Sequence, residues 1–237
     1  MTMKRLISTI WNDLLGLLYP RLCLVCETPL NSGEEHLCLS CLYKLPRTNY
    51  HRLPDDKNPL RRPFDGFPSV SRIISYLHFE KKGPTQRLIH HFKYHGDDRL
   101  AIYLGRLAAK ELRADGCFTD IDRIVPVPLH PRKMRQRGYN QSERIARGFA
   151  EVYDIPIDTD SLVRQIHTET QTHKSAYDRR QNMVNVFAIA RPEQLAGHHI
   201  LLIDDVLTTG STLLSCIDVL HTVPRLRISI FTMSTVM

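Results

Sequence analysis

The sequence lacks an apolar run approaching the length of about 20 residues that a membrane-spanning helix needs, which argues against an integral membrane protein. It also lacks the features of a secretory signal peptide: Asn12 and Asp13 interrupt the apolar residues that follow Lys4 and Arg5, and no small-residue cleavage site comes after them. The apolar residues between 6 and 18 recur at spacings of three and four. This period favours a helix packed on its own domain over a helix on a membrane surface.

The chain has no internal repeat and no low-complexity tract, and its 42% hydrophobic and 24% charged residues argue against disorder. Its 237 residues are enough for one sizeable core and a small appendage. Acidic residues are the scarcer charged class: 32 lysines and arginines against 25 aspartates and glutamates leave a formal net charge of +7. This excess favours anionic partners such as phosphates, nucleotides, nucleic acid or a membrane surface without choosing among them.

Cysteine is also scarce, and four of the six residues form two Cys-x-x-Cys pairs separated by eleven residues. The four are Cys23, Cys26, Cys38 and Cys41. Two residues between thiolates let both sulfurs of a pair reach one ion, and four thiolates complete a tetrahedral shell with no open position. The pattern therefore predicts a structural Zn²⁺ site in a reducing, cytoplasmic compartment. His36 is an alternative ligand, and free thiols, two disulfides or a redox dithiol are the alternatives to zinc.

Apolar segments that alternate with helical patterns predict an α/β domain after the cysteine module. Strands are expected near 70–79, 121–129, 183–189, 199–203 and 226–233, and helices near 85–95, 99–114 and 140–153, with one more between the last two strands. Strands separated by helices favour a mainly parallel sheet flanked by helices. The expected division is a zinc-ribbon-like module with the N-terminal helix over 1–45, a proline-rich linker or covering segment over 46–68, and the α/β domain over 69–237.

Two adjacent aspartates, Asp204 and Asp205, follow the apolar strand 199–203. Buried carboxylates are unfavourable, so the pair is expected where the strand emerges at the carboxyl edge of the sheet, which is the ligand crevice of open parallel sheets. The next residues place hydroxyl groups and a glycine before a helix: Thr208, Thr209, Gly210, Ser211 and Thr212. Backbone N–H groups, hydroxyls and a helix N-terminus favour a phosphate group. The stretch therefore predicts a sugar-phosphate site, with a plain strand, turn and capped helix as the alternative.

A basic stretch follows the strand at 121–129 and carries Arg132, Lys133, Arg135 and Arg137. Such a cluster binds pyrophosphate or nucleic acid, or is simply a solvated surface. Its position between a strand end and a helix favours a stiff, proline-containing loop at the same sheet edge as the aspartates. A second polar stretch, 164–187, is either a plain surface loop or a loop that closes over a reacting centre.

The stretch LLIDDVLTTGST at 201–212 closely resembles the phosphoribosyl pyrophosphate loop of type I phosphoribosyltransferases, and no lysine follows its glycine as in a P-loop. The wider set of motifs resembles the ComF family of phosphoribosyltransferase-like proteins, which includes competence proteins acting in DNA uptake and GntX-type proteins. The motifs are the four-cysteine module, FKYHGDDRLA at 92–101, PVPLHPRKMRQRGYNQSE at 126–143, and TQ with RRQN within 170–182. The resemblance covers nearly the whole chain.

The resemblance implies a type I phosphoribosyltransferase-like fold that binds phosphoribosyl pyrophosphate with Mg²⁺. It implies that Asp204 and Asp205 contact the ribose hydroxyls, that residues 208–212 hold the 5′-phosphate, and that residues 170–182 form the flexible loop. The pyrophosphate-binding loop would comprise Leu129, His130, Pro131 and Arg132. Arg132, Lys133 or Arg137 would stabilise negative charge on a departing pyrophosphate.

Turnover is left open by the sequence, because only 25 residues follow Thr212 and no base-selecting segment is found beyond the aromatic Phe231. One hypothesis is a phosphoribosyltransferase with an unidentified acceptor. A second is a non-catalytic protein that binds a sugar phosphate or single-stranded DNA, since residues 130–147 hold six basic residues and one acidic residue. A third is that the zinc module docks a protein of the DNA-uptake machinery.

Overall fold

A four-stranded parallel sheet forms the centre of the protein, whose computed structural model describes residues 20–165 and 186–236. The spatial order of the strands is β1 (Val70–His78), β6 (Arg227–Thr235), β5 (His199–Leu207) and β2 (Arg123–Pro126). All three pairings are parallel, which confirms the parallel sheet expected from the sequence. Because the strands are parallel, the carboxyl end of β5 lies between those of β6 and β2.

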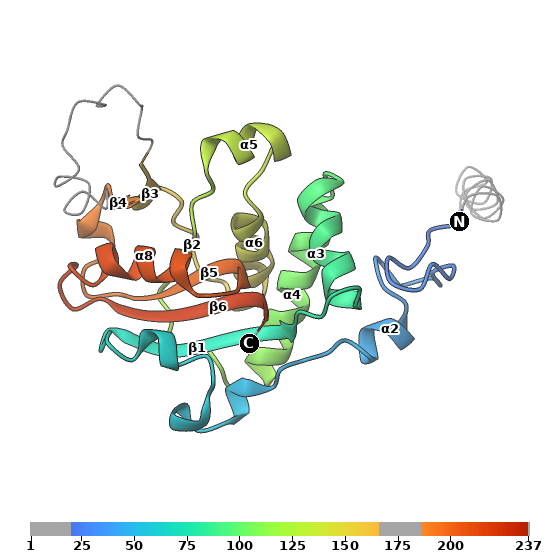
Figure 1. The fold of residues 1–237 in the computed structure, drawn as a ribbon, viewed down its shortest axis with the longest axis horizontal. Coiled ribbons are helices and arrows are strands. Elements are labelled where there is room, and N and C mark those ends of the chain that lie inside the picture. Colours follow the sequence, from blue (N-terminus) through green and yellow to red (C-terminus); the bar gives the residue numbers. More distant parts are fainter. Residues whose placement is uncertain (1–19, 166–185, 237) are drawn as a thin grey trace, which may run out of the picture.

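Helices cover both faces of this sheet (Figure 1). The helices are α3 (Pro84–Tyr94), α4 (Asp98–Ala114), α6 (Gln141–Tyr153) and α8 (Ser211–Leu220), each where the sequence predicts one. Successive residues of β5 point to opposite faces, so that Leu201 joins the hydrophobic core beneath α3, α4 and α6 while Leu202 joins the core beneath α8. This near-continuous apolar run is typical of a strand that is covered on both faces.

Two glycines allow α4 and α6 to approach each other closely. A Cβ atom at Gly105 would lie 2.3 Å from the carbonyl oxygen of Ile145, and one at Gly148 would lie 2.3 Å from that of Ile102. Any side chain at either position would push the helices apart. The contact therefore fixes the position of α6, whose first turn reaches the carboxyl edge of the sheet.

A separate two-stranded ribbon pairs β3 (Leu162–Arg164) with β4 (Phe187–Ile189) in antiparallel fashion. The strand expected near 183–189 is present at Phe187–Ile189, but it lies outside the parallel sheet. A parallel pairing needs a crossover connection, whereas β4 returns alongside β3 and pairs with it directly. Phe187 is buried in the same hydrophobic core as α8.

The proline-rich segment 46–68 lies along the outer edge of the sheet. It forms three short 3₁₀ turns, Tyr50–Arg52, Asp55–Lys57 and Arg62–Phe64. The side chains of Leu60 and Phe64 are fully buried in the core beneath α8. The backbone N–H of Thr48 donates to the carbonyl of Tyr76 at 3.0 Å, so the segment also covers the free edge of β1.

None of the helices within the described residues is long and apolar enough to cross a membrane. The amphipathic helix expected between residues 6 and 18 lies outside the described residues. The flexible loop expected at 170–182 lies outside them as well.

Candidate functional site

Asp204 and Asp205 occupy the last part of β5, where the strand passes from buried into half-buried surroundings. Residues 199–203 are buried and both aspartates are half-buried, so the pair lies at the carboxyl edge, as the sequence predicts. The backbone N–H of Asp205 donates to Oδ1 of Asp204 at 2.8 Å. The two carboxylates therefore stand in different surroundings even though they are adjacent in the chain.

The first turn of α6 orients Asp204. Ser142 Oγ donates to Oδ1 of Asp204 at 3.0 Å. Asn140 caps the helix by accepting from the N–H of Ser142 at 3.1 Å, and its Nδ2 donates to the carbonyl of Val127 at 3.0 Å. The N–H of Val127 donates in turn to the carbonyl of Ile203 at 2.9 Å. The chain leaving β2, the start of α6 and the end of β5 are thus joined by hydrogen bonds that fix the hydroxyl of Ser142.

Lys93 of α3 holds the second carboxylate. Its Nζ lies 2.8 Å from Oδ2 of Asp205, and the two side chains are only 17% and 16% exposed. Such a sheltered pair is screened less by solvent than a surface ion pair.

The sequence patterns assign no role to Lys93 or Ser142, although Lys93 belongs to the motif FKYHGDDRLA and Ser142 to the motif NQSE. Those motifs were the available signal, but only the fold shows that both meet at the aspartates.

The electrostatics of the two aspartates favour a proton on Asp204. Burial raises the pKa of Asp204 to about 7, and the negative charge of Asp205 adds to the rise. The hydrogen bonds from Asp205 N–H and Ser142 and the charge of Lys93 oppose the rise. Near neutral pH, Asp204 can therefore accept a hydrogen bond from a ligand hydroxyl when ionised and donate one when protonated.

Residues 208–212 form an exposed turn into α8. Gly210 precedes the helix with a φ of 81°, in the left-handed region that glycine adopts without steric strain. Thr209 Oγ1 donates to Oγ of Ser211 at 3.3 Å. The four side chains with hydroxyl groups in this turn are exposed, namely Thr208, Thr209, Ser211 and Thr212. A phosphate group approaching here would meet hydroxyl donors and the N-terminus of a helix that directly follows the aspartates.

The basic stretch forms a short helix, α5 (Pro131–Arg137), where the sequence predicted a stiff loop. Pro131 occupies the first helical position, and Nδ1 of His130 accepts from the N–H of Arg132 at 3.1 Å. Gly138 ends the helix in the left-handed conformation. The loop prediction is wrong because an N-terminal proline, a capping side chain and a terminal glycine together favour a helix.

Helix α5 projects beyond the sheet beside α3 (Figure 1). Arg137 connects the two helices, since its guanidinium lies 5.3 Å from the centre of the Tyr94 ring, and it also donates to Oε1 of Gln141 at 2.8 Å. Arg132 is exposed on α5. The two arginines predicted to bind pyrophosphate thus differ, since Arg137 is anchored by neighbouring side chains and Arg132 is exposed.

The residues between β2 and α5 leave the sheet beside the aspartates. Pro126 at the end of β2 pairs with Ile203, the residue before Asp204. Leu129 and His130 follow in half-buried positions. The structure therefore brings the aspartates, the turn 208–212 and the start of α5 to one edge of the sheet.

The four predicted zinc ligands converge in the N-terminal module. The Sγ atoms of Cys23, Cys26, Cys38 and Cys41 all lie within 4.8 Å of one another, and each thiol is free. Backbone N–H groups turn towards sulfur: those of Cys38 and Cys41 donate to Sγ of Cys23 and Cys38, both at 3.4 Å. This four-sulfur cluster could hold a metal ion. His36 is not part of it, since its Nδ1 lies 3.7 Å from Oδ2 of Asp97.

The close packing of these four thiols suits a cluster that binds a cation. Hydrogen bonds from Thr28 lower the pKa of Cys26 to about 6, whereas burial raises the pKa of Cys41. Four thiols packed this closely cannot all ionise without a compensating positive charge. Glu34 shapes the loop between the cysteine pairs by accepting from the N–H groups of Asn31 at 2.6 Å and Leu39 at 2.7 Å.

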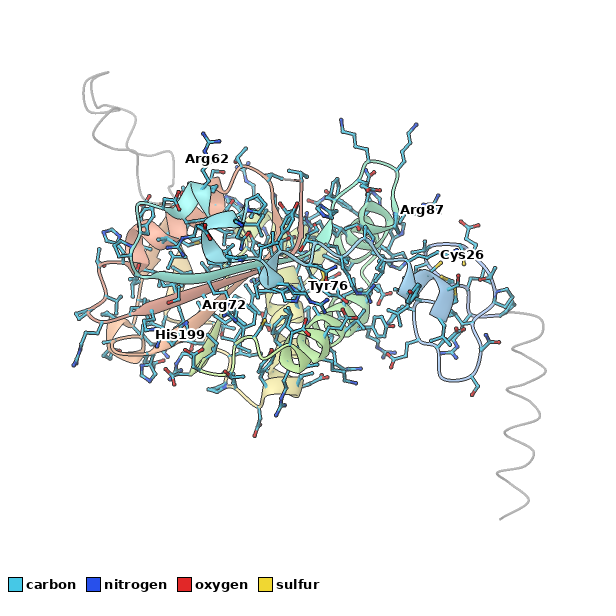
Figure 2. All side chains as sticks on the ribbon, turned by 90° about the horizontal axis from the view of Figure 1, so that it is seen from below. Cys26, Arg62, Arg72, Tyr76, Arg87 and His199 are labelled. Carbon is cyan, nitrogen blue, oxygen red and sulfur yellow. The ribbon has the colours of Figure 1, made fainter. Side chains whose placement is uncertain are left out.

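The cysteine module packs on the helices of the α/β domain. Cys23 and Leu37 are buried in the core beneath α3 and α4. Arg87 of α3 donates to the carbonyl of Val25 at 2.7 Å, and the ring of His36 lies 5.2 Å from that of Tyr103 on α4. Figure 2 shows Cys26 and Arg87 at the same end of the molecule. The cluster thus supports the helix that carries Lys93.

Comparison with known proteins locates this chain among characterised sequences. Residues 136–233 match the family described as phosphoribosyl transferase domain. The chain is 32% identical over 208 residues to DNA utilization protein YhgH of Escherichia coli O157:H7, covering 81% of this chain and 87% of that protein. It is 29% identical over 204 residues to competence protein F of Haemophilus influenzae, covering 81% and 87%.

Among solved structures, the chain is similar to a glutamine phosphoribosylpyrophosphate amidotransferase of Bacillus subtilis complexed with ADP and GMP. The identity is 19% and the TM-score is 0.41. The similar region covers 56% of this chain and 26% of the amidotransferase chain, so this chain spans about a quarter of that enzyme.

Proposed function

The chain belongs to the ComF family and has a type I phosphoribosyltransferase-like fold, and from this premise we propose that it binds phosphoribosyl pyrophosphate with Mg²⁺ at the carboxyl edge of the sheet. The proposal rests on one observation. Ser142 and Lys93 hold Asp204 and Asp205 immediately before the exposed hydroxyl-rich turn 208–212. Carboxylates that accept hydrogen bonds from sugar hydroxyls thus lie next to groups that donate hydrogen bonds to a phosphate. A sugar phosphate needs both.

Each part of the ligand has a candidate partner. Asp204 and Asp205 would accept hydrogen bonds from the ribose hydroxyls, and residues 208–212 would hold the 5′-phosphate. The residues Leu129, His130 and Arg132 would line the pyrophosphate site, with Arg137 adding positive charge. A pyrophosphate in that position would lie beside a helix that begins at Pro131 with a capped N-terminus.

The donor set at the aspartates suits magnesium, because carboxylate oxygens are among the hard ligands that Mg²⁺ prefers. When bound with the ligand, the ion would neutralise charge on the pyrophosphate. Lys93 keeps Asp205 in place and offsets its charge, while Ser142 orients Asp204. Transfer of the phosphoribosyl group to an acceptor would be a second step. Binding of phosphoribosyl pyrophosphate does not require this transfer.

We further propose that the four cysteines hold a structural Zn²⁺. A closed set of four sulfurs leaves no position for a substrate. The ion would stabilise the module at 1–45 against α3 and α4, and the segment 46–68 would connect it to the domain at 69–237.

A role in DNA uptake in the cytoplasm is proposed from the two relatives, which are named for DNA utilization and competence.

A second candidate function is binding of single-stranded DNA, which needs no catalysis. The exposed basic side chains of α5 and of the following helix favour such contacts. Measuring DNA affinity between low and high salt tests it. A steep loss of affinity with added salt is expected, and affinity that does not respond to salt contradicts it.

Calorimetric titration of phosphoribosyl pyrophosphate with Mg²⁺ tests the main proposal. Wild type is expected to bind, and Asp204→Ala/Asp205→Ala is expected to lose binding. The matched control Asp56→Ala/Asp218→Ala removes two exposed acidic groups that belong to neither β5 nor the turn 208–212, and it should bind like wild type. Absence of binding to wild type overturns the proposal. Assay of pyrophosphate release with candidate acceptors then distinguishes a transferase from a binding protein.

A further inference from the structure

A cavity opens at the amino edge of the sheet, opposite the aspartates. It has a volume of about 470 Å³, within the range of about 300–1,000 Å³ that is usual for small-molecule sites. Its lining comes from the starts of β1, β5 and β6 and from the loop that follows α4. Figure 2 shows two of its residues, Arg72 and His199, near each other and far from Cys26.

The sheet register explains why polar groups gather there. Arg72 of β1 is the neighbour of Ser229 on β6, and His199 of β5 is the neighbour of Arg227 on β6. Because Arg227 and Ser229 are two residues apart, they lie on the same face of the sheet. Three neighbouring strands therefore present two guanidinium groups, a hydroxyl and an imidazole to one cavity.

The two arginines differ in their partners. Arg227 donates to Oδ2 of Asp120 at 2.8 Å, so its charge is balanced by a carboxylate. Arg72 is exposed, and within residues 20–165 and 186–236 its guanidinium interacts with the thiol of Cys117 but forms no salt bridge with a carboxylate. Ser71 and Thr119 also line the cavity. Arg72 is thus the cation that remains available to an incoming anion.

His199 is held rigidly in this wall. Its Nε2 lies 2.9 Å from Oγ of Ser229, and its Nδ1 lies 3.1 Å from Oδ2 of Asp120. The order serine, histidine, aspartate is that of a hydrolase triad. Ser229, however, is only 1% exposed and lies within a central strand, so a substrate carbonyl has no access to its hydroxyl. The network therefore fixes the cavity wall instead of supplying a nucleophile.

The loop after α4 is shaped to cover this cavity. Gly116 and Phe118 have φ values of 72° and 59°, and a left-handed conformation is unusual for a bulky residue such as Phe118. The side chain of Phe118 is buried, with its ring 6.4 Å from that of Phe149. Anchored in this way, the loop turns the neighbouring Thr119 and Asp120 towards the strand ends.

We propose that this amino-edge cavity binds a small phosphate monoester, with Arg72 as its main ligand. A guanidinium group binds phosphate oxygens through paired hydrogen bonds, and Ser71 and Thr119, which carry hydroxyl groups, line the same cavity. The volume accommodates a ligand of nucleotide size. The site is separate from the one at the carboxyl edge, because His199 and Asp204 stand at opposite ends of the buried part of β5, about 17 Å apart at roughly 3.3 Å per residue.

Amide chemical shifts of ¹⁵N-labelled protein test this proposal with site resolution. Inorganic phosphate and adenosine monophosphate are titrated separately, and the amides of Arg72, Thr119 and Arg227 are followed beside those of Thr209 and Gly210. Saturable shifts are expected at the first three amides. Tighter binding of the nucleotide than of phosphate would identify a ligand larger than the free ion, and equal binding would identify the phosphate group alone as what is recognised.

Variants separate the two edges of the sheet. Arg72→Gln is expected to weaken binding at the amino-edge amides by about tenfold or more, as loss of a charge-assisted contact predicts. Arg62→Gln removes another exposed arginine, from a different surface, and should leave these shifts unchanged (Figure 2). Asp204→Asn/Asp205→Asn should also leave these shifts intact, so the result does not depend on the proposed function. Shifts confined to Thr209 and Gly210, or affinity within twofold of wild type in Arg72→Gln, overturn the proposal.

Discussion

Lys93 and Asp205 form an ion pair at 2.8 Å that connects α3 to the carboxyl end of β5. The neighbouring carboxylate of Asp204 has a raised pKa, partly because of the charge on Asp205. Lys93 thus offsets one of two negative charges that stand next to each other in half-buried positions. Without it, the two acidic groups would repel each other in a region of low solvent exposure.

Replacing Lys93 with methionine is therefore expected to weaken binding of phosphoribosyl pyrophosphate with Mg²⁺ by about tenfold, which corresponds to about 1.4 kcal/mol. The apolar stem is kept and only the charge is lost. Calorimetric titration measures the change. Lys110→Met, on the exposed side of α4, serves as the control and should bind like wild type. Unchanged affinity in Lys93→Met would show that the ion pair has no part in the site.

Asp204 makes stability depend on pH. Its pKa is raised from the usual value near 4 to about 7, because the folded state favours the protonated carboxyl. The contribution of this protonated group to the free energy of unfolding is therefore fully present below pH 4 and is lost as the pH rises through about 7. Asp204→Asn removes this titration. We expect the variant to be more stable than wild type at pH 8 by roughly 1–3 kcal/mol, and by less at pH 5. Urea denaturation at both pH values measures the difference.

The control for this experiment is Asp218→Asn, which changes an exposed residue of α8 and should show no such dependence on pH. An Asp204→Asn variant whose advantage is the same at pH 5 and pH 8 would contradict the raised pKa.

The cysteine cluster predicts metal-dependent stability. Cys38→Ser removes one sulfur of the four and should lower the bound zinc from one equivalent to a small fraction, with a lower melting temperature. Metal analysis of the purified protein and a thermal melt measure both effects. Cys117→Ser, a buried cysteine outside the cluster, should keep its zinc. Full zinc content in Cys38→Ser would rule out four-cysteine coordination.

Gly210 predicts a conformational constraint at the turn before α8. A Cβ atom there would meet only ordinary contacts, the nearest at 3.6 Å from Phe64, so the expected effect comes from the φ of 81°. Gly210→Ala should lower the free energy of unfolding by about 1–2 kcal/mol. Gly66→Ala is the matched control, since a Cβ at Gly66 has open space and its φ lies outside the left-handed region. Equal stability of the two variants would refute the constraint.

Sequence patterns predicted well where the cause is local. The period of apolar residues located α3, α4, α6 and α8, because a helix that buries one face must repeat it every three to four residues. Local reasoning was wrong for the basic stretch, where capping signals outweighed the prolines. It located the strand β4 but not its pairing with β3, because that pairing is decided by the path of the chain.

The sequence by itself determined the main helices, the convergence of two cysteine pairs and the placement of the aspartates beside a hydroxyl-rich turn, because each depends on residues close together in the chain. Only the tertiary structure decided that Ser142, 62 residues away, orients Asp204 and that Lys93 balances Asp205. It also decided that Arg72 and His199 share a cavity. These relationships follow from strand order and helix packing. A local sequence pattern does not show which distant side chains a parallel sheet brings to the same edge.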